Sequence, residues 1–341
     1  MPGTGEITLN GIANLKHFVR SSIFFDGQER GRCYFWRLPF LRAEAAQAIL
    51  NGMAFTNPFR QKGVWLKGNT HTHTRLSDGA LTAREVGREY GARGYDFVFL
   101  TDHWLRTKAP GGSRRAPLLI PAEEIDFTMG TDMYHVVCLG LRREWKRGKV
   151  RSWKALRDRA RRENVTLILA HPYWSGTRSG EAIAAGAFHG VEVYNTICDQ
   201  VNAKGHAGAF WDDLLDAGQP VMGLAADDLH WAAQAGGGWI MVKAVARSPV
   251  SILSAIRRGC FYSTQGPEIK DIAVRGRRIE IACSPVRRIN FVANRGNGKV
   301  FTAGPRSLTG AAWEAGDGIA CVRVECVDKR GRIAWSNPVF F

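Results

Sequence analysis

Residues 64–79 of the 341-residue chain read VWLKGNTHTHTRLSDG. A short apolar run ends in a polar stretch that places His71 and His73 one residue apart and Asp78 five residues further on. Side chains alternate along a strand, so the two imidazoles are expected to point to the same side, about 6–7 Å apart, within reach of one metal ion. A polar turn is the alternative, and the rest of the chain has to decide between the two.

The same arrangement recurs along the chain, with an apolar run leading into ionisable side chains. Runs at 96–100, 116–120, 165–170 and 220–225 lead into Asp102 and His103, Glu123 and Glu124, His171, and Asp228 and His230. His135 is the exception, because it is expected to open its own strand, HVVCLGL. Carboxyl ends of parallel strands meet at one rim, where barrel and open-sheet enzymes assemble their sites. The histidines, Glu124 and Asp228 are therefore predicted to form one metal centre, with Asp102 and Glu123 as neighbours of the ligands.

The spacing of apolar residues predicts the fold class. Helical periodicity at 82–90, 152–163 and 209–217 separates the apolar runs, which indicates β/α units around a parallel sheet or barrel. Further on, alternating segments with glycine-containing turns predict an all-β, sandwich-like module. The chain is thus expected to comprise an N-terminal segment of unassigned role (1–60), an α/β domain (61–268) and a C-terminal β module (269–341).

Composition narrows the class of protein. With 45% hydrophobic and 23% charged residues, and no apolar run near the roughly 18 residues of a membrane span, the chain is typical of a soluble globular protein. The N-terminus MPGTGEITLN resembles no secretory signal, so a cytoplasmic location is expected. Seven scattered cysteines without a Cys-x-x-Cys motif argue against a disulfide framework or a zinc ribbon.

The net charge of +16 is compatible with an anionic substrate, nucleic acid or a solvated surface. The densest basic run, 142–162, has apolar residues at helical spacing and is predicted to be a helix with a charged outer face. No nucleic-acid-binding module accompanies it. A small-molecule substrate is therefore expected rather than nucleic acid, and the sequence gives no indication of oligomeric state.

The motifs HTHTRLSDG, TDHW, IPAEEID, HVVCLGL, AHPYW and ADDLH, which span about Trp65 to His230, together resemble the PHP (polymerase and histidinol phosphatase) superfamily of metal-dependent hydrolases. The resemblance implies a distorted (β/α)7 barrel that holds two or three divalent ions of zinc, manganese or iron. It implies three ligand groups: His71, His73, Glu124 and Asp228; Glu124, His135 and His171; and Asp78, His103 and His230. Glu124 rather than Glu123 fits the family's Gly-x-Glu pattern, although this chain has Ala122 in place of the glycine.

A second likeness concerns residues 200–341. The segments WDDLLDAGQPVMGLAADDLH, RRGCFYSTQGPEI and AWSNPVFF resemble the CehA/McbA group, which includes carbaryl hydrolases and phosphoesterase-like proteins. This resemblance accounts for the C-terminal β module. It does not fix a substrate, because one fold serves many reactions.

The expected activity is hydrolysis by a hydroxide that bridges two ions and is held by His71, His73, Glu124 and Asp228. The preferred substrate is a small phosphomono- or phosphodiester. An aryl ester or carbamate is the main alternative, followed by a DNA-associated exonuclease and, last, a non-catalytic binding protein. Two sets of substrate contacts are predicted: Arg75, Arg106 and Arg178 for a phosphate, and Trp104, Tyr173, Trp174 and Trp231 as an apolar wall.

Overall fold

A computed structural model describes residues 55–111, 116–129, 132–186 and 188–341. The residues from Gly52 onward form one unit, to which all of the described residues belong. The predicted N-terminal segment is therefore described only from Phe55, and its first 54 residues lie outside the described part. Phe55–Arg60 pack against the C-terminal strands, where Arg60 forms an ion pair with Asp271 at 2.7 Å.

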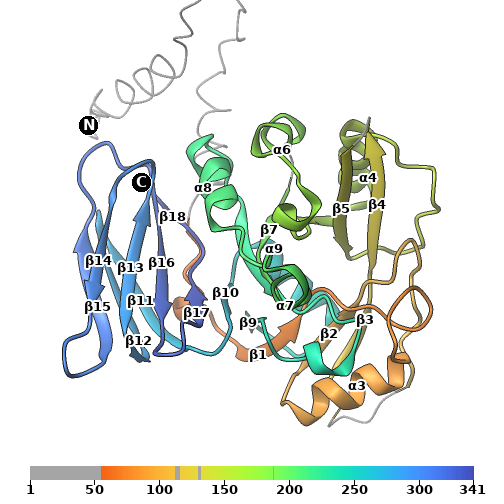
Figure 1. Ribbon diagram of the computed structural model, residues 1–341, viewed down its shortest axis with the longest axis horizontal. Helices are drawn as coiled ribbons and strands as arrows, with labels where there is room; N and C mark the ends of the chain where they lie inside the picture. Colours follow the sequence, from red (N-terminus) through yellow and green to blue (C-terminus); the bar gives the residue numbers. More distant parts are fainter. Residues whose placement is uncertain (1–54, 112–115, 130–131, 187) are drawn as a thin grey trace, which may run out of the picture. The chain divides into compact units, whose positions relative to one another are not determined.

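The largest sheet has ten strands in the order β14-β13-β16-β17-β10-β9-β1-β2-β3, with β18 paired to β16 (Figure 1). Its site-bearing part combines parallel pairing of β1, β2 and β3 with antiparallel pairing of β1 and β9. The bounds in this part are β1 (Val64–Asn69), β2 (Phe97–Leu100), β3 (Leu118–Pro121), β9 (Trp239–Ala244) and β10 (Phe261–Thr264).

A second sheet has five strands in the order β4-β5-β6-β7-β8. Its strands are β4 (Glu123–Met129), β5 (Asp132–Leu139), β6 (Thr166–Leu169), β7 (Gly190–Asn195) and β8 (Met222–Ala226). The pairs β4–β5 and β5–β6 are antiparallel, whereas β6, β7 and β8 are parallel. Buried side chains of both sheets, among them Leu66, Phe97, Ile168 and Leu224, form a common apolar core.

The three predicted helices are confirmed, and their N-termini follow capping rules. Thr82 and Glu85 form a capping box at the start of α3, and Ser152 accepts a hydrogen bond from the Ala155 N–H at the start of α4. The helix bounds are α3 (Ala83–Ala92), α4 (Trp153–Glu163), α5 (Pro172–Ser175), α6 (Ser179–Ala185), α7 (Thr196–Asn202), α8 (Gly208–Asp216) and α9 (Pro249–Arg257), with 3₁₀ turns η1 (Pro58–Arg60) and η2 (Ala232–Gln234).

The mixed α/β class is confirmed, but the predicted distorted (β/α)7 barrel is not. The two sheets meet through isolated parallel bridges, Thr72 with Leu229 and His103 with Glu124. One side of this ring is the antiparallel hairpin β4–β5, which has no intervening helix among the described residues. The prediction that His135 opens its strand is also wrong, because β5 begins three residues earlier, at Asp132.

Five of the C-terminal strands, β13, β14, β16, β17 and β18, continue the largest sheet, and three others form a sheet of their own. β10 pairs with β17 in antiparallel fashion, so hydrogen bonding runs unbroken across the predicted boundary at 268/269. A separate sheet, β11-β12-β15, packs its apolar face against β13 and β16 (Figure 1, blue). The bounds are β11 (Ile269–Arg275), β12 (Arg278–Val286), β13 (Arg288–Ala293), β14 (Gly298–Thr302), β15 (Leu308–Glu314), β16 (Cys321–Val327), β17 (Ile333–Trp335) and β18 (Val339–Phe340).

Two further expectations concern single residue types and segments. The six cysteines in the described part of the chain are free thiols, in agreement with the prediction that they form no disulfide framework, and all six are buried. Among the described helices, none has the length and apolar character that crossing a membrane requires.

Candidate metal centre

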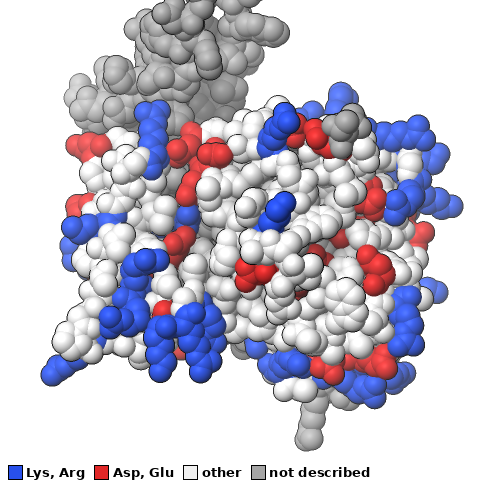
Figure 2. Space-filling model, viewed as in Figure 1, with Lys and Arg blue, Asp and Glu red and all other residues white. Residues whose placement is uncertain are grey.

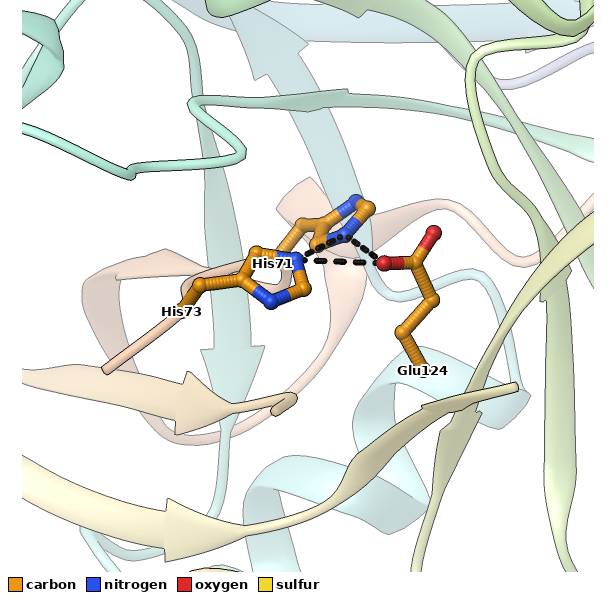
Figure 3. A group of neighbouring side chains, drawn as sticks. All are labelled: His71, His73 and Glu124. Carbon is orange, nitrogen blue, oxygen red and sulfur yellow. Dashed lines mark hydrogen bonds and ion pairs between the residues drawn. The ribbon is translucent and has the colours of Figure 1, made fainter. Parts of the chain in front are cut away.

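Four side-chain atoms from three segments meet at the core of the site, and Figure 3 shows three of the residues, His71, His73 and Glu124. His71 and His73 follow β1, Glu124 is the second residue of β4, and Asp228 follows β8. The two Nε2 atoms are 3.1 Å apart, and each lies 3.1 Å from Glu124 Oε2. Each also lies 3.2 Å from Asp228 Oδ1. The sequence-predicted ligands of the first ion are therefore neighbours in the structure.

The donor atoms form two overlapping groups. Those of His71, His73 and Glu124 all lie within 4.8 Å of one another, as do those of His71, His171 and Asp228. The distances of 3.1–3.2 Å suit atoms that share one ion at Zn–N and Zn–O distances of about 2.0–2.2 Å. Asp228 Oδ1 is buried, and neither of its contacts with the imidazoles has hydrogen-bond geometry.

Glu192 determines which nitrogen of His71 faces the other ligands. Its Oε1 lies 2.7 Å from His71 Nδ1, and because an ionised carboxylate only accepts, Nδ1 carries the proton. When Nε2 is deprotonated, as metal binding requires, its lone pair points at Glu124 and Asp228. Glu192 Oε2 also accepts from the His171 backbone N–H and the Asn195 side chain. A carboxylate that fixes a ligand imidazole in this way is common around protein-bound metals.

The charges of the cluster act strongly on one another. Burial by itself lowers the pKa of His71, but the carboxylates, Asp228 first and then Glu124, raise it well above its ordinary value. Burial raises the pKa of Glu124, but the charges of His71 and His135 hold it well below its usual range. The carboxylates stay ionised, and the cluster as a whole attracts positive charge, which a divalent ion would supply.

A second donor group uses the other oxygen of Glu124. Its Oε1 lies 2.8 Å from His135 Nδ1 and 3.2 Å from His171 Nε2, while Oε2 faces the first group. Glu124 is thus placed as a carboxylate between two ion positions. Glu123, its neighbour, points away and accepts hydrogen bonds from the Trp145 backbone N–H through both oxygens.

A third group gathers around Asp78. Its carboxylate lies 3.3 Å from His230 Nε2 and 3.6 Å from His103 Nε2, and 3.2 Å from His73 Nδ1. The turn that brings it there needs Gly79, since a Cβ at this position would lie 2.5 Å from the carbonyl oxygen of His73. The family resemblance implied that Asp78, His103 and His230 bind one ion. In the structure Asp78 lies near both histidines, but the residues whose donor atoms group together are His73, Asp78 and His230, while His103 groups with Glu124 and His135.

Backbone strain coincides with the site. His171 and Asp228 have positive φ angles of 25° and 52°, a region that non-glycine residues rarely adopt. Buried hydrogen bonds compensate at Asp228: the adjacent Asp227 accepts from the backbone N–H groups of 236–238 and from the hydroxyls of Tyr90 and Thr196. Such strain is found where a fold holds functional side chains in place.

A cavity of about 710 Å³ opens beside these groups. Its wall includes Trp174 and Trp231 but neither Trp104 nor Tyr173. Trp104 has a φ of 54° and is buried, with its Nε1 donating to the Asp126 carbonyl. Trp104 follows the predicted ligand His103 in sequence, but its side chain therefore points away from the site.

The three arginines predicted to bind phosphate are not brought into the cavity either. Arg75 donates to the Ala80 carbonyl and Arg106 to the Leu141 carbonyl, while Arg178 lies at the N-terminus of α6. A different arginine, Arg147, lines the cavity.

Sequence reasoning missed several residues that the structure places at or behind the site. Asn195 donates to both Glu192 and Asp228, and Asp126 lies 3.2 Å from His103 Nδ1. Arg147 forms a two-point ion pair with Asp126. The only available signal was weak: Asn195 ends an apolar strand run, as the predicted ligands do.

Comparisons with known proteins give structural likenesses only. No protein-family model matches the chain, and no curated protein sequence matches it. A two-domain protein from Bacteroides vulgatus that contains a predicted PHP-like metal-dependent phosphoesterase is similar at 14% identity and a TM-score of 0.46, covering 81% of this chain and 93% of that one. An amidohydrolase from Chromobacterium violaceum, with bound sulfate and no metal, is similar at 17% identity and a TM-score of 0.36, covering 48% and 87%.

A third solved structure, from Bifidobacterium adolescentis and described as a candidate metal-dependent phosphoesterase, has 12% identity and a TM-score of 0.36, covering 56% of this chain and 96% of that one. All three TM-scores lie below 0.5. The function of this chain therefore has to follow from its own residues.

Proposed function

We propose that the chain is a PHP-type metal-dependent hydrolase that cleaves small phosphomono- or phosphodiesters. The observation that carries the proposal is the set of donor distances of 3.1–3.2 Å among His71, His73, Glu124 and Asp228, buried and beside a cavity. Carboxylate and imidazole donors suit Zn²⁺, Mn²⁺ or Fe²⁺, and bound ions of this kind would polarise the scissile group and acidify a water molecule.

The chain's own residues would hold and orient this chemistry. Glu124 presents one oxygen to His71 and His73 and the other to His135 and His171, so one side chain can join two ion positions. Glu192 keeps the proton of His71 on Nδ1 and leaves Nε2 free to bind. Preorganised groups of this kind need no rearrangement when charge develops in the transition state.

A small substrate is favoured over nucleic acid by the distribution of charge. On the face of the molecule that Figure 2 shows, basic side chains lie mostly toward the margins, with uncharged and acidic side chains between them. An aryl ester or carbamate is the second candidate, favoured by the indoles of Trp174 and Trp231 in the cavity wall.

The test combines metal analysis of the purified protein with a substrate panel: p-nitrophenyl phosphate, bis-p-nitrophenyl phosphate, 1-naphthyl carbamate and 1-naphthyl acetate. We expect bound divalent metal and release of p-nitrophenol from the phosphoesters. Faster turnover of the carbamate or acetate would favour the second candidate. His73→Ala should lose metal and activity, whereas His206→Ala, at an exposed position outside the cluster, should keep both. Metal and activity retained in His73→Ala would refute the proposal.

A further inference from the structure

The cavity beside the metal centre has an apolar wall that the hydrolysis of a phosphate group does not by itself require. Its large apolar members are Met133, Trp174, Ile197, Val201 and Trp231. Ile197 and Val201 are four residues apart on α7 and thus lie on one face of that helix.

Exposed apolar side chains are ordinary when they occur singly, but a group that shares one concave surface indicates a binding site. Trp174 is 37% exposed and Trp231 54% exposed, and Met133 and Val201 are also exposed. Contact between these apolar side chains and water is unfavourable, and a ligand that covered them would remove this cost. The four side chains therefore indicate that an apolar group occupies the cavity.

The two indoles lie directly beside the predicted ligands. The Trp174 ring packs edge-on against His171 and His135, with centroid distances of 5.0 and 5.6 Å. The Trp231 ring lies 5.8 Å from that of His230. An apolar group against these indoles would lie next to a phosphate held at the ion positions. It would thus be the alcohol part of the substrate.

Charge further restricts this alcohol. Among the described residues of the wall, Arg147 is the only lysine or arginine, and both of its terminal nitrogens are bonded to Asp126, at 2.9 and 3.2 Å. The other ionisable groups of the wall are carboxylates and imidazoles of the donor groups, with Asp126 behind them and the buried Cys198 thiol. No uncommitted cation is left for a second anionic group on the substrate. The alcohol part should be neutral.

We propose that this wall is a subsite for the aromatic alcohol part of an aryl phosphoester. The inference rests on the proposed function and names its substrate class: water adds to phosphorus, the phosphorus–oxygen bond to the arenol breaks, and the arenol leaves with one proton. Flat rings fit between indoles better than branched or hydroxylated alcohols, because they bury area without leaving hydroxyls unpaired.

The first measurement compares kcat/KM for 2-naphthyl phosphate and glycerol 3-phosphate in Trp174→Ala, Trp231→Ala and Tyr173→Ala. Tyr173 is the matched control, because it is an exposed aromatic residue of the same short helix, α5, but does not line the cavity. Both tryptophan variants should raise KM for the naphthyl ester by roughly 10-fold with little change for glycerol 3-phosphate. Equal losses for both substrates, or the same loss in Tyr173→Ala, would overturn the subsite.

The second measurement needs no activity. Binding of 2-naphthol to the purified chain, followed by its fluorescence, should weaken roughly 10-fold in either tryptophan variant and stay unchanged in Tyr173→Ala. If naphthol binds in this way but no phosphoester is hydrolysed, the subsite holds and the proposed function fails. If phosphoesters are hydrolysed but naphthol does not bind, the function holds and the subsite fails.

Discussion

The donor cluster and the C-terminal strands are both buried, yet they are built on opposite principles. In the C-terminal core, residues such as Ile289 and Phe291 pack apolar surface between two sheets, which stabilises the fold without any ligand. In the donor cluster, buried carboxylates and imidazole nitrogens converge at 3.1–3.2 Å. Buried charges are costly unless they are compensated. The comparison teaches that one region is stabilised by its own packing, whereas the other holds charges that a bound cation would compensate.

The largest effect is expected from a substitution of Glu124, which lies at the centre of the donor cluster. Glu124→Gln replaces a carboxylate placed between two ion positions by a neutral amide, and kcat should fall by at least about 10²–10³-fold. The matched change is Glu123→Gln, one residue away, where the side chain only accepts from the Trp145 backbone N–H. Initial rates with p-nitrophenyl phosphate measure both variants. Comparable losses in the two would contradict the placement of Glu124.

A smaller effect is expected from a substitution of Glu192, which contacts the far nitrogen of the predicted ligand His71. Glu192→Gln keeps one acceptor but places an amide among the donors of His71, His171 and Asn195. Metal affinity should fall by about 10–100-fold. Competition with a metallochromic chelator measures it. An unchanged affinity would mean that Glu192 is a structural residue only.

Glu123, next to the donor cluster in sequence, should make the free energy of unfolding depend on pH. Burial raises its pKa to about 8, although the hydrogen bonds from the Trp145 N–H oppose the shift. The folded state then holds a proton that the unfolded state releases above pH ~4.5, so stability is lost as pH rises from there to about 8. In Glu123→Gln this loss should be smaller by on the order of 1–2 kcal/mol. Urea unfolding at pH 5 and pH 8.5 gives the comparison, and parallel pH profiles would contradict it.

The smallest effect belongs to the C-terminal core. Ile289→Val removes one buried methylene between the sheets and should cost about 0.5–1.5 kcal/mol of unfolding free energy. Metal content and kcat should stay at wild-type values, because the site does not depend on this packing. A loss of metal in this variant would show that the two regions are not independent in the way described.

The sequence predicted well those features that repeat a local pattern. His71, His103, His171 and Asp228 each follow an apolar run, and the structure places them together for that reason. Helices α3 and α4 were predictable from Thr82 and Ser152, whose side chains cap them. Apolar periodicity and capping are both local signals, so they can be recognised in the sequence without knowledge of the fold.

Features that depend on long-range pairing could not be predicted. The segment EEIDFTM has too many polar residues to suggest a strand, yet it pairs along its length with β5, and so the hairpin in place of a β/α unit was missed. Trp104 follows His103 but is turned into the core by its positive φ. Asp126 and Arg147 meet only because β4 and the loop after β5 come together.

The most direct test of the central claim is thermal unfolding of the chelator-treated chain as Zn²⁺ or Mn²⁺ is added back. An ion that binds the folded state stabilises it by about 2.7 kcal/mol at a concentration of 100 times its Kd, so Tm should rise with metal concentration. The rise should disappear in His73→Ala and persist in Ile289→Val. A Tm that is the same with and without metal, in a chain that retains no metal, would contradict the account.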